Sequence, residues 1–209
     1  MKLVTFTRSG KQSYGFVDND TITDIGQTLG NTHPDLKSLI GDDYPKLISS
    51  SADTAPRVAL RDVQLLPPIT NPDKIICVGL NYESHRKETG RPEVEFPTLF
   101  TRFSNSQIGD GEAMWRPAES TSFDYEGELA VIIGSGGWKI PKDKALEHVA
   151  GYSCYNDGSV RDWQRHTSQF TPGKNFRRTG PFGPWLVTTD EIPDPSTLTL
   201  TTRLNGEVM

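Results

Sequence analysis

Glycine and proline are spread along the whole chain and leave little room for long helices. The 209 residues include 19 glycines and 15 prolines, so about one residue in six favours a turn. Proline breaks the interior of a helix and glycine weakens it. Short strands joined by tight turns tolerate this distribution best. We therefore predict a mainly β fold with a few short helices.

The first part of the chain alternates between apolar and polar residues. This alternation predicts strands at Leu3–Phe6, Tyr14–Val17 and Thr21–Ile25. The first pair is separated by Ser9-Gly10 and the second by Asp18-Asn19-Asp20, both of which are typical turn sequences. We expect these segments to form an antiparallel meander.

A short helical segment and another strand follow the meander. Apolar residues recur at helical spacing over residues 35–49, with an interruption near Pro45. The sequence Val58–Leu66 predicts a strand, and the prolines at 67, 68 and 72 mark its end. We place a boundary near residue 70, between a small β-rich N-terminal domain (residues 1–70) and a larger second domain (residues 71–209).

Apolar runs in the second part predict a further set of strands, with room for one or two short helices. We expect a short helix or mobile loop over residues 81–90, a short helix over residues 142–149, and a loop rich in glycine and proline over residues 171–184. Asn205-Gly206 is a strong hairpin turn. The expected strands are Lys74–Val78 (as a buried strand), Thr98–Phe103, Glu126–Ile133, Tyr152–Asn156, Trp185–Thr188 and Leu198–Leu204.

Charge and composition exclude several classes of protein. The chain has 22 basic against 27 acidic residues and a net charge near -5, whereas binding to nucleic acid needs concentrated positive charge. It has no run of 18 apolar residues to span a bilayer, and its first residues lack the apolar stretch of a signal peptide. Cys77 and Cys154 cannot build a disulfide framework and lie in apolar strands, so we expect buried thiols and a cytoplasmic location.

The sequence Asp124-Tyr125-Glu126-Gly127-Glu128 opens a strand that is otherwise apolar. Glu126 and Glu128 are two residues apart, so they would face the same side of that strand. Two adjacent carboxylates repel unless a cation neutralises them or their pKa rises. Asp157 follows the next predicted strand and would add a third oxygen if the strands are neighbours. Such a set suits Mg²⁺ or Mn²⁺.

The same residues also allow a simpler interpretation. Glu126 and Glu128 would then lie on a solvated face, and Asp157 would only begin a turn with Gly158. Spacing alone leaves both interpretations open.

Five motifs, in this order, resemble those of the fumarylacetoacetate hydrolase family. The resemblance covers roughly residues 70–209, and many members also carry a small β-rich N-terminal domain. The similarity is greatest to bacterial 2-hydroxyhepta-2,4-diene-1,7-dioate isomerases and acylpyruvate hydrolases. The motifs are Asn81-Tyr82-x-x-His85-x-x-Glu88, Asp124-Tyr125-Glu126-Gly127-Glu128-Leu129, Asn156-Asp157, Arg161-Asp162-Trp163-Gln164, and Gly173-Lys174-Asn175-Phe176 through to Trp185.

The resemblance implies a fold and a set of functional residues. The fold would have a mixed, rolled β-sheet core, usually in a homodimer. A divalent metal, Mg²⁺ or Mn²⁺ (or Ca²⁺ in crystals), would be held by Glu126, Glu128 and Asp157. His85 and Glu88 would form an acid–base dyad on a segment that orders over the substrate, and Lys174 would stabilise enolate charge. The implied or candidate substrate-binding residues are Gln164, Arg161 and Tyr82.

The resemblance also implies an activity. Its main form is metal-dependent hydrolysis of a carbon–carbon bond in a 2-oxo or 1,3-dicarbonyl acid of the acylpyruvate or fumarylacetoacetate type, through a metal-stabilised enolate, as in aromatic catabolism. The alternatives are isomerase, tautomerase or decarboxylase action on a 2-hydroxy-dienedioate or oxaloacetate-like acid, or a family member that binds metal without turnover. The expected partners are the small acid and a second copy of the chain, with no nucleic acid and no membrane.

Two features depart from the family pattern. Many relatives carry an acidic residue where this chain has Arg177, which changes how a distal part of the substrate would be bound. Arg161, Arg177 and Arg178 could each bind a distal carboxylate, although surface charge is the simpler role for the last two. Relatives also continue past Asn205-Gly206 through further strands and a helix. We therefore expect the catalytic domain to be incomplete at its C-terminus.

Overall fold

The computed structural model describes residues 1–88, 90 and 95–209, and gives only the backbone of Ser84, His85 and Glu88. Short strands dominate it, as predicted. The strands are β1 (Lys2–Arg8), β2 (Lys11–Asp18), β3 (Thr21–Thr23), β4 (Arg57–Ala59), β5 (Gln64–Leu66), β6 (Ile75–Gly79), β7 (Thr98–Arg102), β8 (Gln107–Ile108), β9 (Phe123–Asp124), β10 (Gly127–Ile133), β11 (Val149–Asn156), β12 (Ser159–Val160), β13 (Gly180–Thr188), β14 (Arg203–Leu204) and β15 (Glu207–Val208).

The described helices are all short, because glycine and proline interrupt the sequence so often. Four 3-10 helices, at Leu60–Asp62, Ser104–Ser106, Lys142–His148 and Pro195–Thr197, connect other elements. The α-helices are α1 (Gly26–Leu29), α2 (Leu36–Ile40), α3 (Tyr44–Ser51), α4 (Glu83–Glu88), α5 (Arg161–Gln164) and α6 (Thr171–Lys174). Among the described residues, no helix has both the length and the apolar character needed to cross a membrane.

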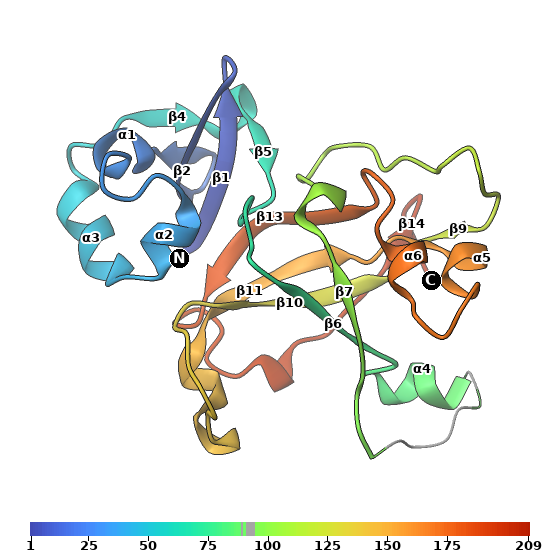
Figure 1. Ribbon diagram of the computed structural model, residues 1–209. Coiled ribbons are helices and arrows are strands. Elements are labelled where there is room, and N and C mark those ends of the chain that lie inside the picture. The colour runs from blue at the N-terminus through green and yellow to red at the C-terminus, as the bar shows by residue number, and fades with distance from the viewer. Residues whose placement is uncertain (89, 91–94) are drawn as a thin grey trace.

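One large sheet joins the two parts of the chain. Its described strands lie in the order β10-β11-β13-β1-β2-β3-β4, with β5 also paired to β1 and β8 to β13. Strand β1 pairs antiparallel with β13, which places Leu3 opposite Leu186. Figure 1 shows β13 running from the elements of the second part towards the N-terminal elements. The predicted domain boundary at residue 70 therefore separates two parts of the chain that share one sheet. The boundary stays a prediction.

The main core lies where this sheet is covered by α2 and α3. Leu3, Leu39 and Leu186 are almost completely buried there. Helix α2 begins where Asp35 accepts a hydrogen bond of 2.7 Å from the backbone N–H of Ser38, so the capping side chain fixes the start of the helix. This core holds β13 in place, and β13 in turn supports β11 and β10.

Strand β10 pairs antiparallel with β11, and their two outer ends meet at Gly127 and Asn156. Glu126 immediately precedes β10 and Asp157 immediately follows β11, so both residues lie at the same end of this strand pair. The small sheet β6–β7 lies over this region, and α5 and α6 lie beside it (Figure 1). The arrangement brings these six elements of the chain to one place.

Several predicted elements differ from the observed ones. Residues 58–66 do not form one strand, because β4 pairs with β3 and β5 pairs with β1, with a 3-10 turn between them. Residues 171–184 are not all loop, since α6 forms and β13 begins at Gly180 with partners on both sides. Only Arg203–Leu204 of the strand expected over residues 198–204 forms, paired with β15 across the predicted hairpin turn.

Two predictions of burial were also wrong. Strand β6 forms, but Ile76 is 60% exposed because it lies on the open face of the two-stranded sheet. Cys154 is exposed on β11, and Cys77 is only partly buried. The expected burial of these strands required covering elements that the described residues do not provide.

Candidate active site

Lys174 is a buried lysine that bridges two acidic side chains. It lies at the end of α6 with 2% of its side chain exposed. Its Nζ atom donates a hydrogen bond of 2.6 Å to Asp157 Oδ2 and another to Glu126 Oε2. The ring of Phe100 lies on another side of the ammonium, at 4.9 Å. An ammonium removed from water in this way needs such charged partners.

The end of the β10–β11 pair positions the carboxylates of Glu126 and Asp157. The backbone N–H of Asp157 donates to the carbonyl of Glu126 at 2.8 Å. The Asn156 side chain accepts from the backbone N–H of Glu126 at 3.1 Å. Both residues are therefore held by backbone contacts as well as by their side chains, and Lys174 lies between their carboxylates.

Gly173 allows the lysine to reach this position. A Cβ atom at residue 173 would collide with the backbone of Gln164. Only glycine permits α6 to lie this close to α5. The close contact of these two short helices therefore explains why a glycine precedes Lys174 in the sequence.

Arg161 lies on the outer side of Glu126. Its guanidinium donates to Glu126 Oε1 at 2.7 Å and to Asp124 Oδ2 at 2.8 Å. It also donates to Gln164 Oε1 at 2.9 Å. Arg161 and Gln164, the two candidate substrate-binding residues from α5, therefore contact each other, and Arg161 also contacts the acidic cluster formed by Asp124, Glu126, Glu128 and Asp157.

Arg102 holds Asp157 from the opposite side and was not identified from the sequence. Its side chain is fully buried and donates to Asp157 Oδ1 at 2.6 Å and to the carbonyl of Gly158 at 3.0 Å. A signal was present in the sequence. Arg102 is two residues from Phe100 on an apolar strand, so both face the interior, and a buried arginine requires an anionic partner.

Glu128 lies near the cluster but has a different partner. The hydroxyl of Tyr82 donates a hydrogen bond to its carboxylate. Burial, and then the charges of Glu126 and Asp157, raise the pKa of Glu128 to about 7 despite that hydrogen bond. This carboxyl group is the one in the cluster that is least compensated by positive charge.

The pKa of Glu126 moves in the other direction. Burial alone would raise it, but the ammonium of Lys174 and the guanidinium of Arg161 outweigh this effect and lower the pKa to about 2. Glu126 therefore stays ionised at any physiological pH, and the two neighbouring carboxyl groups have separate electrostatic environments.

The predicted metal ligands are thus only partly assembled. The structure brings Glu126 and Asp157 together around Lys174, and places Glu128 beside them on Tyr82. Among the described residues, no three His, Cys, Asp or Glu side chains converge into a ready metal site. The donor chemistry nevertheless fits a hard cation, because all three groups are carboxylates and two already share a positive charge. Their role as ligands stays a prediction.

The predicted dyad lies on α4. His85 and Glu88 belong to this six-residue helix, three positions apart, so its backbone forms the short helix expected there. Both side chains lie outside the described part of the structure. Whether they face the carboxylates therefore stays a prediction.

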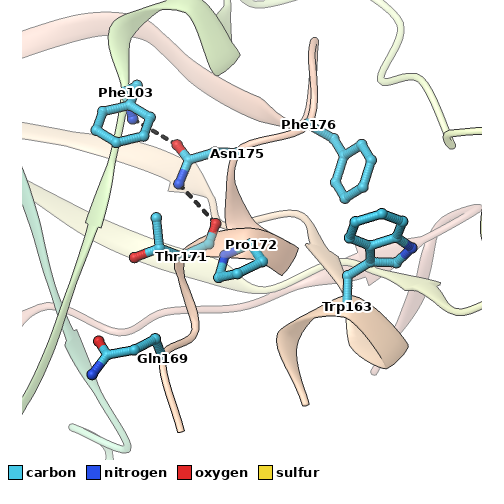
Figure 2. A pocket seen from close by; sticks show the side chains of 7 residues that line it. All are labelled: Phe103, Trp163, Gln169, Thr171, Pro172, Asn175 and Phe176. Carbon is cyan, nitrogen blue, oxygen red and sulfur yellow. Dashed lines mark hydrogen bonds between the residues drawn. The ribbon is translucent and has the colours of Figure 1, made fainter. Parts of the chain in front are cut away.

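A separate surface pocket of about 550 Å³ lies beside α6 (Figure 2). Neither Lys174 nor any of the carboxylates lines it, and we do not assign it to the chemistry. Asn175 stabilises its wall by accepting from the backbone N–H of Phe103 at 2.7 Å. The lining residues are Phe103, Trp163, Gln169, Thr171, Pro172, Asn175 and Phe176.

Comparison with known families places this geometry in a context. Residues 74–209 match the family described as fumarylacetoacetate (FAA) hydrolase, C-terminal, and residues 1–68 match the one described as Rv2993c-like, N-terminal. The chain belongs to the fumarylacetoacetate hydrolase family. The predicted mainly β fold is confirmed, and the members of this family are enzymes.

A curated relative of the family illustrates its range of reactions. The chain is 43% identical over 150 residues to the mitochondrial oxaloacetate tautomerase FAHD2A of Homo sapiens. This match covers 71% of the chain but 48% of the relative, so the chain spans about half the length of the curated relatives it matches.

Solved structures of the family are also similar over the chain. A fumarylacetoacetate hydrolase from psychrophilic Exiguobacterium antarcticum aligns with a TM-score of 0.83 and 36% identity, over 100% of this chain and 73% of that one. A maleylpyruvate hydrolase from Sphingobium sp. SYK-6, in complex with manganese(II) and pyruvate, aligns with a TM-score of 0.76 and 28% identity, over 94% and 70%.

Proposed function

We propose that this chain carries the active site of a divalent-metal-dependent hydrolase, which cleaves a carbon–carbon bond in a 2-oxo or 1,3-dicarbonyl acid. The observation that carries the proposal is the bridge from buried Lys174 to Glu126 and Asp157. The two carboxylates would bind a divalent cation, and the lysine adds a fixed positive charge. Positive charge of both kinds would stabilise a developing enolate. Membership of the fumarylacetoacetate hydrolase family supports the reaction class.

Glu126, Glu128 and Asp157 would hold the cation, which we propose to be Mg²⁺ or Mn²⁺. Carboxylate oxygens without histidine or cysteine suit these ions. The manganese(II) in the maleylpyruvate hydrolase complex supports this choice. When bound, the cation would supply Lewis-acid stabilisation of negative charge on the oxygens of the acid.

The side chains around the cation site would supply the other functions. Lys174 would hold negative charge on the substrate oxygens, and Arg161, Gln164 and Tyr82 would bind and orient the acid. His85 would take a proton from water while Glu88 orients its imidazole, which we infer from their spacing in α4.

A second reaction class is favoured by one specific observation. The 43% identical human relative is an oxaloacetate tautomerase, which moves a proton without cleaving the carbon skeleton. The same lysine, carboxylates and dyad would serve a tautomerase, an isomerase or a decarboxylase. A member that binds metal without turnover is the remaining alternative, and the His85–Glu88 motif argues against it.

The test is turnover of three acids by the purified protein with Mn²⁺. We expect an acylpyruvate to be cleaved to pyruvate, measured by coupling to lactate dehydrogenase. Oxaloacetate and a 2-hydroxy-dienedioate test the tautomerase, decarboxylase and isomerase alternatives. Turnover of only these last two would contradict the hydrolase proposal, and no turnover of any would contradict catalysis altogether.

His85→Ala tests the proposed dyad in the same assay. We expect hydrolysis to be lost while Mn²⁺ binding is retained. His148→Ala is the matched control, because His148 ends the 3-10 helix at the opposite end of the β10–β11 pair. Unchanged turnover in His85→Ala would remove the dyad from the mechanism. A homodimer and a cytoplasmic location remain predictions.

A further inference from the structure

Arg102 is the largest fully buried side chain among the described residues. It is charged, it lies at the acidic cluster, and the proposed chemistry does not use it. Its NH1 atom donates to Asp157 Oδ1 at 2.6 Å and to the carbonyl of Gly158 at 3.0 Å. One guanidinium thus holds both the side chain of Asp157 and the backbone that follows it.

The second terminal nitrogen of the guanidinium is anchored to other segments. Its NH2 atom donates to Thr179 Oγ1 at 2.8 Å and to Ser106 Oγ at 3.3 Å. The ring of Tyr155 lies 5.7 Å from its central carbon. These contacts fix the plane of Arg102, so the hydrogen bond to Asp157 comes from a rigid donor rather than from a mobile surface charge.

The two oxygens of Asp157 therefore have different roles. Oδ1 is occupied by Arg102, whereas Oδ2 faces the ammonium of Lys174 at 2.6 Å. Glu126 shows the same division, because Oε1 accepts from Arg161 at 2.7 Å and Oε2 accepts from Lys174. In both carboxylates an arginine holds the oxygen that does not contact Lys174, which we call the outer oxygen. The oxygen that contacts Lys174, the inner oxygen, is left for a cation.

We propose that Arg102 is a positioning residue for the cation site, with Arg161 as its counterpart on Glu126. Each arginine restrains its carboxylate so that a single oxygen is presented inward. This inference rests on the proposed function, since it assumes that the inner oxygens bind a metal ion. Outer partners of this kind orient metal ligands and commonly change affinity by about 10–100-fold when removed.

The direction of the change in Mn²⁺ affinity distinguishes a positioning role of Arg102 from a purely electrostatic one. Arginine stays protonated, so each guanidinium repels a metal cation. If charge alone mattered, removal of Arg102 would tighten binding of Mn²⁺. If Arg102 positions Asp157, its removal weakens binding although a repulsive charge has gone.

The test is calorimetric titration of Mn²⁺ into the parent protein, Arg102→Met, Arg102→Lys and Arg161→Met. We expect binding to weaken by about 10–100-fold in each methionine variant, and less in Arg102→Lys, which retains a donor. Arg178→Met is the matched control. The side chains of Arg178 and Arg161 are both 23% exposed, but Arg178 pairs with Glu112 instead. The electron paramagnetic resonance spectrum of bound Mn²⁺ should change in the Arg102 variants and stay unchanged in the control.

Thermal melts identify any variant that does not fold. If Arg102→Met fails to fold, Arg161→Met tests the same proposal at a more accessible position. Mn²⁺ binding as tight as in the parent, or tighter, in the folded variants would overturn the inference alone. If the parent itself binds no Mn²⁺, the proposed metal site is wrong and the inference fails with it.

Discussion

The ammonium of Lys174 lies 2.6 Å from Asp157 Oδ2, and 2% of its side chain is exposed. A charged pair this deeply buried is costly to form and costly to break, because the remaining charge keeps its desolvation penalty without compensation. Both the stability of the metal-free protein and the affinity of the site for cations should therefore depend on this lysine.

Replacement of Lys174 by methionine should affect stability and metal binding in opposite directions. Without Mn²⁺, we expect the free energy of unfolding to fall by about 3–5 kcal/mol, as for other broken buried pairs. Because the ammonium no longer competes for the inner oxygens of Glu126 and Asp157, Mn²⁺ should bind more tightly and recover much of this loss. Urea melts with and without Mn²⁺ measure both effects. Equal destabilisation at all Mn²⁺ concentrations would contradict competition for these oxygens.

The contact between Leu3 and Leu186 should couple the two parts of the chain. Leu3 in β1 lies opposite Leu186 in β13, and neither is exposed. We expect Leu3→Ala to lower the free energy of unfolding by about 2–5 kcal/mol, through lost burial and the cavity left behind. The melt should stay a single transition. Leu198→Ala, at a side chain that is 44% exposed, serves as the control, and separate transitions for the two parts would contradict the coupling.

Asp35 gives a stability contribution that depends on pH. Its side chain caps α2 and also accepts from Asn71 at 2.7 Å. Although partial burial opposes the change, hydrogen bonds from Ser38 and Asn71 lower the pKa of Asp35 below its ordinary value. The stabilisation is therefore present above the unfolded-state pKa and is lost as pH falls through the lower folded-state pKa.

Substitutions at Asp35 separate the cap from its charge. Asp35→Ala should cost about 1 kcal/mol at pH 7, whereas Asp35→Asn retains the cap and should remove this residue's pH dependence. The measurement is the urea midpoint between pH 2 and 7. An identical pH profile for the parent and Asp35→Asn would show that this carboxyl group does not contribute.

The two cysteines should differ in reactivity. Cys154 is exposed, whereas Cys77 is partly buried, and burial followed by the charge of Asp157 raises the pKa of Cys77 to about 12. Because the thiolate is the reactive form, iodoacetamide at pH 8 should label Cys154 first. Labelling of Cys77 should keep increasing with pH towards 12. Peptide mass spectrometry, with Cys154→Ser as the control, would contradict this order if Cys77 were modified first.

Local patterns predicted the parts of the fold that depend on local chemistry. The meander β1–β3 follows from alternation and from turn residues such as Asn19, which adopts a φ of 52°. The helix after Asp35 follows from its cap. Residues 58–66 were harder, because their two halves pair with strands that are distant in the sequence, and no periodicity within the segment indicates that change of partner.

The same limit applies to the site. Neighbouring strands were enough to suggest that Glu126 and Asp157 lie close together, because both residues flank one strand pair. The link from Arg102 to Asp157 spans 55 positions and depends on how β7 lies over β11, which the sequence pattern does not specify. The contact of Glu128 with Tyr82 was missed for the same reason.

The most direct test of the central claim is calorimetric titration of Mn²⁺ into the parent protein and into Glu126→Ala. The account predicts that the parent binds Mn²⁺ at a site formed by Glu126, Glu128 and Asp157, and that Glu126→Ala loses most of this affinity while remaining folded. Equal affinity in the parent and in Glu126→Ala would contradict the proposed metal site.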